Sequence, residues 1–284
     1  MKLSPSIFAL SILGKALADC GKEGETITID NDGGFDKLKE LEQCDIIKGD
    51  IIIDPKFVYF ILDGPTEIQG KITAHNNEIL KFVAAANVTK IGGYSLADPA
   101  ISSQTSFPEL VEIGNLEWTG IQQIELYGLF AWKAPHVSHI SNFSVTATEL
   151  SGFTADYPTL DEGEFYYDGF PALESADKIE IKSNWLMPAV VFEALKTIGR
   201  LTISNNKRLE KIEFPLLTKA GEIFIADNVT EINFPVLEQV ESFTVRVPDS
   251  SLLDCAALDG IRKIAKVFEC DKYTIPRNAT KLHY

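Results

Sequence analysis

The chain has 284 residues, of which 45% are hydrophobic, so it is long and apolar enough to build a large core. The formal net charge at pH 7 is −15. A surface this acidic repels nucleic acid and anionic lipid, so we expect neither as a partner. We also expect no transmembrane segment, because no stretch after the N-terminus is long and apolar enough to span a bilayer.

The N-terminal segment, 1–18, has the features of a secretory signal peptide. Lys2 precedes an apolar run, and the triplet Ala16-Leu17-Ala18 predicts cleavage before Asp19. Lys15 interrupts the apolar run, which leaves a buried first strand as the alternative interpretation. We interpret residues 1–18 as a signal peptide and expect an extracellular protein, either secreted or associated with a cell wall.

Residues 19–45 are expected to form an N-terminal cap. Phe35, Leu38, Leu41 and Cys44 follow one another at intervals of three residues, which indicates a short helix beneath the first coil. Two similar strands then follow at 47–53 and 68–74. Each contains a glycine that permits a tight bend at its start.

A recurring phrase dominates residues 46–250. It consists of an aromatic residue, Pro, a Leu two positions later and an apolar residue three further on, and then two alternating strand positions. Two of its six copies vary at the first two positions, and the copies begin at Phe107, Ala134, Phe170, Phe192, Phe214 and Phe234. Such a period marks a solenoid, in which each unit buries its apolar face only by stacking on its neighbours. The proline should open an extended segment.

The sequence therefore predicts a mainly β fold, a right-handed β-helix or leucine-rich-repeat-like solenoid with short helical caps at both ends. Ile181, Ile203 and Ile225 should align on adjacent coils. Regularity is weakest at 120–168, where we expect a bulge or loop. Residues 251–284 form the predicted C-terminal cap and tail, because apolar residues from 252 to 267 have helical spacing.

Asparagines follow three of the predicted strands at equal intervals, at positions 184, 206 and 228. In leucine-rich-repeat solenoids a stacked asparagine satisfies backbone groups at such a turn, so we predict a ladder here. Asn228 also begins a glycosylation sequon, and a buried ladder amide cannot carry a glycan. The next coil is shorter, which favours an outward Asn228.

Four cysteines flank the repeats. They allow three pairings, and only Cys20–Cys44 with Cys255–Cys270 avoids bridging opposite ends of a rod, so we predict those two disulfides. Metal binding is the alternative, but no Cys-x-x-Cys spacing or nearby histidine cluster supports it. Four sequons agree with secretion and predict N-glycosylation, at Asn87, Asn142, Asn228 and Asn278.

Two sequence features resemble a known family. The segment Cys44-x-x-Ile47-x-Gly49-Asp50-Ile51-x-Ile53 resembles the opening of a receptor L domain. The Phe-Pro-x-Leu coils are similar to those of fungal GPI-anchored cell-wall organisation proteins, which share that fold. The resemblance covers roughly residues 35–270 and implies an extracellular, glycosylated, non-enzymatic protein of the cell wall. This chain ends at Tyr284 without a hydrophobic tail, so we expect no GPI signal in it.

We expect no catalytic, cofactor-binding or metal-binding residues. His136 and His139 have a spacing that suits a metal, but two polar residues flanking an apolar coil position are the simpler interpretation. The enzyme alternative is a polysaccharide lyase or hydrolase of β-helix type, which needs converging carboxylates. The only acidic cluster is Asp161-Glu162-Gly163-Glu164, and we interpret it as a solvated loop.

Binding is the favoured function. Five aromatic residues are candidates for an outward-facing surface: Trp118, Tyr127, Trp132, Tyr167 and Trp185. Such side chains stack on sugar rings and anchor protein interfaces. The first hypothesis is a scaffold that binds wall polysaccharide or wall proteins. The second is a soluble receptor-like module that captures a secreted polypeptide.

Overall fold

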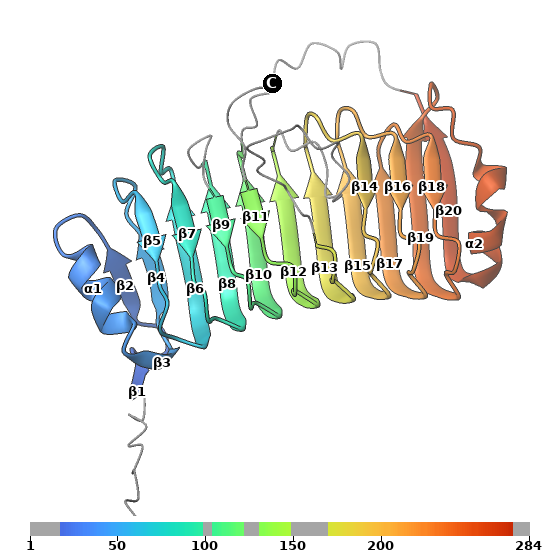
Figure 1. Cartoon of the computed structure of the whole chain (residues 1–284). Coiled ribbons are helices and arrows are strands. Elements are labelled where there is room, and N and C mark those ends of the chain that lie inside the picture. The colour runs from blue at the N-terminus through green and yellow to red at the C-terminus, as the bar shows by residue number, and fades with distance from the viewer. Residues whose placement is uncertain (1–17, 99–103, 122–130, 149–169, 275–284) are drawn as a thin grey trace, which may run out of the picture.

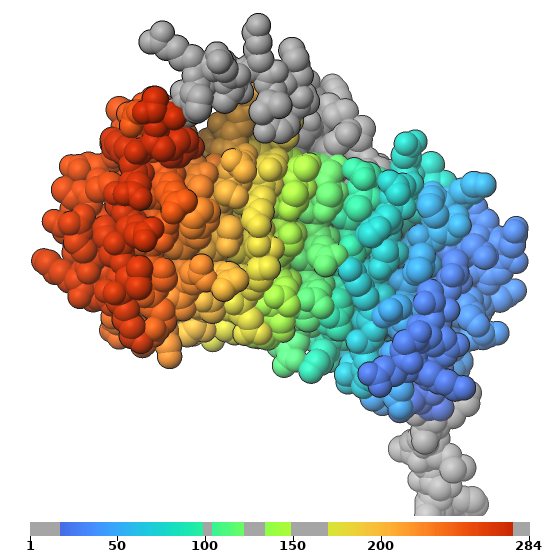
Figure 2. Space-filling model, turned by 180° about the vertical axis from the view of Figure 1, so that it is seen from behind, coloured from blue at the N-terminus to red at the C-terminus, as the bar shows by residue number. Residues whose placement is uncertain are grey.

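The computed structural model describes residues 18–98, 104–121, 131–148 and 170–274. They form a rod of stacked coils that progresses in chain order from one end to the other (Figure 1), and Figure 2 shows the same progression from behind. The predicted mainly β solenoid with short terminal helices is confirmed. No helix in the described segments has the length and apolarity needed to cross a bilayer.

One side of the rod is a 13-stranded sheet with the order β1-β3-β6-β8-β10-β12-β13-β15-β17-β19-β20, in which β2 and β4 pair beside β6. Its strands are β1 (Ala18–Cys20), β2 (Thr26–Ile29), β3 (Cys44–Ile47), β4 (Asp50–Ile53), β6 (Glu67–His75), β8 (Lys90–Ala97), β10 (Glu112–Thr119), β12 (His139–Thr146), β13 (Ser175–Lys182), β15 (Thr197–Ser204), β17 (Lys219–Ala226), β19 (Gln239–Pro248) and β20 (Ala265–Tyr273). Neighbouring strands are parallel, as successive coils require.

Two smaller parallel sheets form another side of the coils. The first has the order β11-β9-β7-β5, and the second has the order β14-β16-β18. Their strands are β5 (Tyr59–Ile61), β7 (Phe82–Ala84), β9 (Gln104–Ser106), β11 (Ala131–Lys133), β14 (Ala189–Val191), β16 (Lys211–Glu213) and β18 (Glu231–Asn233).

The core is a set of aligned apolar rows. Ile181 is the register partner of Ile203, which is in turn the partner of Ile225, and all three are fully buried, as predicted. The repeat phenylalanines form a second row, in which the rings of Phe192 and Phe214 have centroids 5.4 Å apart. Each coil thus covers the apolar face of the one before it, which is how a solenoid obtains a continuous core.

The Phe-Pro motif makes a β-turn, so the prediction of an extended segment is wrong. The Leu217 amide donates to the Phe214 carbonyl over 3.3 Å, and Leu110 donates to Phe107 in the same way over 3.2 Å. Proline occupies the second position of this four-residue turn, where its fixed φ is favourable. The turn places both the phenylalanine and the leucine inside the coil.

The predicted asparagine ladder exists, with one substitution. Asn184 and Asn206 are buried, and the Asn184 side chain donates to Asn206 Oδ1 over 2.8 Å. The third position is occupied by Asp227, which is 5% exposed and accepts from Asn206 Nδ2 over 2.8 Å. Asn228 is exposed, in agreement with the outward orientation favoured by the shorter coil.

Both ends of the rod carry a helix and a disulfide. The predicted pairs Cys20–Cys44 and Cys255–Cys270 are both formed. Helix α1 (Gly34–Leu41) buries Leu38 and Leu41 against the first coil, as predicted.

The helical prediction for 252–267 is correct only in part. The 3-10 helix η1 (Cys255–Leu258) and α2 (Asp259–Ile264) lie within that range. From Ala265 the chain forms β20, because Phe268 and Cys270 continue the inward rows of Phe243 and Val245. At this end of the rod, the alignment of Phe268 and Cys270 with the inward rows therefore determines the structure more strongly than the helical spacing of apolar residues does.

Candidate functional site on the outer face of the large sheet

The outer face of the 13-stranded sheet is built from polar side chains in register. Side chains alternate between the two faces of a strand, so the positions between the buried rows point outward. One outward row, which we call the middle row, contains Thr73, Ser95, Glu117, Ser144, Glu180 and Thr202. The neighbouring row contains Lys71, Gly93, Asn115, Asn142, Lys178 and Arg200.

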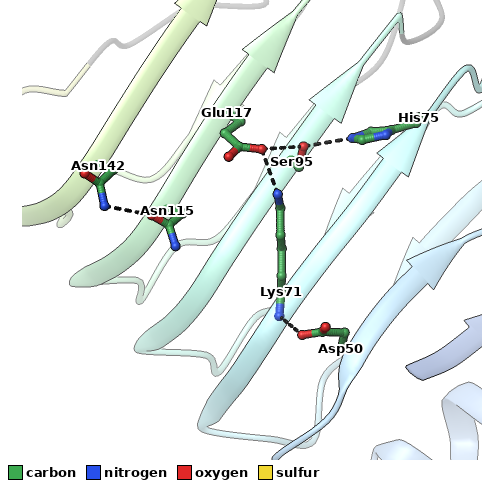
Figure 3. A network of polar contacts seen from close by, with 7 residues as sticks. All are labelled: Asp50, Lys71, His75, Ser95, Asn115, Glu117 and Asn142. Carbon is green, nitrogen blue, oxygen red and sulfur yellow. Dashed lines mark hydrogen bonds and ion pairs between the residues drawn. The ribbon is translucent and has the colours of Figure 1, made fainter. Parts of the chain in front are cut away.

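A lysine crosses one strand of this face to reach a carboxylate (Figure 3). Lys71 on β6 places its Nζ 2.7 Å from Glu117 Oε2 on β10, although β8 lies between these strands. The register partner of Lys71 on β8 is Gly93. A Cβ atom added at Gly93 would lie 3.0 Å from Lys71 Cγ, so the glycine leaves room for the lysine chain.

The same carboxylate holds a serine and, through it, a histidine. Ser95 Oγ donates to Glu117 Oε2 over 3.1 Å and lies 2.8 Å from His75 Nε2. Because the serine hydrogen is directed at Glu117, the histidine nitrogen is the donor in the second bond. Ser95 is 3% exposed, so this trio is not an accessible nucleophile with its base. The bonded serine and histidine instead fix the position of the Glu117 carboxylate.

Beside this network lies a shallow open depression of about 330 Å³ between β10 and β13. Its polar lining consists of Asn115, Glu117, Thr119, Asn142, Ser144, Lys178 and Glu180. Asn142 Nδ2 donates to Asn115 Oδ1 over 2.8 Å, which holds both amides on the floor of the sheet (Figure 3). Amides, hydroxyls and charges together offer hydrogen bonds of both senses to a polyhydroxylated ligand.

Both carboxylates of the depression favour the ionised state. The hydrogen bond from Lys71 lowers the pKa of Glu117. Hydrogen bonds from Lys182 and Lys178 lower the pKa of Glu180, and their Nζ atoms lie 2.8 and 2.9 Å from its oxygens. A general acid for glycoside cleavage requires a raised pKa, which neither of these groups has. Within the described residues, no group of three or more His, Cys, Asp or Glu side chains is placed to hold a metal.

The substitution Lys71→Met is expected to raise the pKa of Glu117 toward the ordinary glutamate value. The methionine keeps an apolar chain but removes the charge and the hydrogen bond that stabilise the carboxylate. Because the pair is solvent-exposed, the free energy of unfolding should change by less than about 1 kcal/mol. A carboxylate titration followed by NMR measures the pKa, and Lys90→Met, which removes the exposed Lys90–Glu112 pair, is the matched control. An unchanged Glu117 pKa would contradict the assigned role of Lys71.

The structure describes the side chains of two of the five aromatic candidates, Trp118 and Trp185. Trp118 is fully buried, so its predicted outward position is wrong: its register partners are Leu96 and Val145 in an inward row. Trp185 is 41% exposed, with Lys207 Nζ 5.1 Å from its ring centroid. Tyr127 and Tyr167 lie outside the described residues. The backbone of Trp132 belongs to β11, but its side chain is outside the described part.

The other candidate residues are distributed over the rod. Asn87, Asn142 and Asn228 are exposed, and Asn278 lies outside the described residues, as does the acidic cluster 161–164. A glycan on Asn142 would be attached to the nitrogen that donates to Asn115 and would cover the depression, so a ligand can enter the depression only where Asn142 is unmodified. His139 Nδ1 lies 2.8 Å from Ser175 Oγ on the next strand. The reasoning from sequence missed the pairing of Lys71 with Glu117. Detecting this pair requires the strand register, because Lys71 and Glu117 are 46 positions apart in the sequence. They lie in adjoining rows, on strands that are separated by β8.

Comparisons with known proteins give a distant likeness. The chain is 24% identical to "Protein ecm33" of Aspergillus fumigatus over 226 residues, which is 78% of this chain and 51% of that protein. The chain thus spans about half the length of this curated relative. No family model matches, and no solved structure matches. The distant match supports, at a coarse level, the resemblance to fungal cell-wall proteins that the repeats indicate.

Proposed function

We propose that this protein is a non-enzymatic scaffold that contributes to the organisation of a fungal cell wall by binding wall glycans or wall proteins. The observation that carries the proposal is the polar depression on the large sheet, where the exposed Asn115 and the half-buried Ser144 and Glu180 offer hydrogen bonds. The likeness to the Aspergillus fumigatus protein supports a role in the wall. The two disulfides suit an oxidising, extracellular location.

The shape and charge of the face support binding without cleavage. An open depression exposes a bound chain to water on one side, whereas enzymes usually enclose their substrates. The ionised Glu117 and Glu180 can accept hydrogen bonds from sugar hydroxyls but are poor proton donors. Alternating charges along the rows also disfavour a strongly charged partner.

Retention on insoluble polysaccharide tests this proposal. We expect the purified protein to sediment with β-1,3-glucan or chitin and the substitution Asn115→Ala to reduce retention several-fold. Asn233→Ala is the matched control, since it removes a hydrogen-bonded amide from the distant β18. Equal retention of the two variants would show that the depression is not the binding site.

The alternatives give different outcomes in the same assay. Failure to bind either polymer, combined with capture of a secreted polypeptide, would favour the receptor-like module. Release of reducing or unsaturated ends from the polymers would contradict the non-enzymatic assignment.

A further inference from the structure

A second surface with a different chemistry lies on the four-stranded sheet. Tyr59 and Ile61 on β5 are 45% and 43% exposed, and Phe60 between them is fully buried. Phe82 on β7 is the register partner of Tyr59 and is partly exposed, and Gln104 on β9 follows it in the same outward row. We call this group of Tyr59, Ile61, Phe82 and Gln104 the aromatic platform.

The parallel register sets the geometry of the aromatic platform. Neighbouring strands are ~4.8 Å apart, so Tyr59 and Phe82 project side by side from one flat surface. Two such side chains present a continuous apolar strip with an amide at its far end. Aromatic rings that are exposed in this way bind flat apolar faces, and the tyrosine hydroxyl and the amide can hydrogen-bond to groups at the ligand's edge. A pyranose ring has this combination of an apolar C–H face and a hydroxylated rim.

The charge pattern narrows the class of ligand. The outward positions of β5, β7 and β9 are Tyr59, Ile61, Phe82, Ala84, Gln104 and Ser106, and none is Asp, Glu, Lys, Arg or His. The fourth strand, β11, has Lys133 in register with Ser106, at the edge of the sheet opposite β5. The matching sheet at the other end of the rod is charged, since Lys211 contacts Glu213 over 2.7 Å and Glu231 over 3.8 Å. In a chain with a net charge of −15, a neutral strip favours an uncharged ligand over a charged peptide or lipid.

We infer that the aromatic platform binds an uncharged hexose polymer, which runs across β5 and β7 and stacks its sugar rings on Tyr59 and Phe82. The site lies on a different sheet from the depression between β10 and β13. It therefore extends the proposed function: one rod would engage polysaccharide through two separate surfaces. Two weak sites on one rigid body would raise the avidity for a wall polymer above that of either site alone.

Binding of soluble oligosaccharides tests this inference. The full chain is titrated with laminarihexaose and with chitohexaose, and affinity is measured by calorimetry and by saturation-transfer NMR. Tyr59→Ser should weaken binding by at least about tenfold, because it removes one stacking ring. Tyr59→Phe should bind nearly as well as the native protein. Tyr273→Ser is the matched control, since Tyr273 is 44% exposed on β20 of the large sheet.

The outcomes separate this inference from the proposed function. Retention on insoluble glucan with unchanged oligosaccharide affinity of Tyr59→Ser would overturn the aromatic platform and leave the proposed function standing. Absence of any oligosaccharide binding by the native protein would also overturn the platform. If Tyr59→Ser instead abolishes self-association in analytical ultracentrifugation and leaves sugar binding intact, the surface serves a second copy of the chain and the inference is wrong.

Discussion

Replacing Asp227 with asparagine is expected to stabilise the rod at neutral pH by up to about 4 kcal/mol. Burial raises the pKa of Asp227 to about 7, more than the hydrogen bonds from Asn206 lower it. The unfolded chain has the ordinary value of 3.8, so the folded state holds a proton that the unfolded state has lost. The contribution of Asp227 to stability is therefore present below pH 4 and is lost as the pH rises through 7.

In the asparagine ladder, each asparagine donates a hydrogen bond to a backbone carbonyl, and Asp227→Asn would add the donor that Asp227 lacks. Asn206 Nδ2 donates to the Ile181 carbonyl over 3.1 Å, and Asn184 Nδ2 donates to the Val145 carbonyl over 3.3 Å. Ile203 is the next residue in that row, and an ionised Asp227 has no hydrogen to donate to its carbonyl. An asparagine at 227 carries such a donor and bears no charge at any pH.

Chemical denaturation at pH 4.5 and pH 8 measures the effect. The native protein should lose stability between the two values, and Asp227→Asn should lose much less. Asp177→Asn is the matched control because it changes the charge equally at an exposed position. If the two variants show the same pH dependence, the buried carboxylate is not its source.

The second large effect is expected from Asn206→Ala, which should reduce the free energy of unfolding by about 3–5 kcal/mol. The Asn206 side chain accepts from the Asn184 amide over 3.1 Å and from its Nδ2 over 2.8 Å, and it donates to Ile181 and Asp227. Alanine leaves these buried groups without partners, and such groups cannot recover their hydration.

The exposed Asn228 provides the control for Asn206→Ala. Asn228→Ala removes an amide from the surface of the adjoining coil and should change stability by less than about 0.5 kcal/mol. Hydrogen exchange should show that Asn206→Ala exposes amides of β13, β15 and β17 before those of β6 and β8. A loss below about 1 kcal/mol, or uniform exchange along the rod, would show that the ladder does not hold the coils together.

The ladder also shows how far the sequence alone could lead. The regular interval between asparagines identified Asn184 and Asn206 correctly and pointed to Asn228 at the third position. Ser183 and Asn205 adopt left-handed backbone conformations, with φ of 56° and 60°, just before the first two ladder residues. The third turn lacks this extra residue, so Asp227 fills the position one residue early. Equal spacing in sequence cannot reveal that a turn has lost a residue.

The site could be predicted less well than the fold, for two physical reasons. The repeat pattern was sufficient to predict the burial of Trp118, since Trp118 occupies the strand position that Ile181 occupies two coils later. The contact of Lys71 with Glu117 was not, because it depends on a register between coils and on the missing side chain at Gly93. Inward residues can be predicted from the pattern within one coil, whereas contacts between surface residues can be predicted only when the alignment of several coils is known.

The alignment of the inward rows has a consequence for how such a chain can change its length. Ile225 and Val245 are aligned neighbours, and so are Val145 and Ile181, although the connection between the second pair is much longer. The interior register is thus the same whether few or many residues connect two coils. Whole segments between coils can therefore be gained, lost or exchanged during evolution or by splicing without redesigning the rod that carries them.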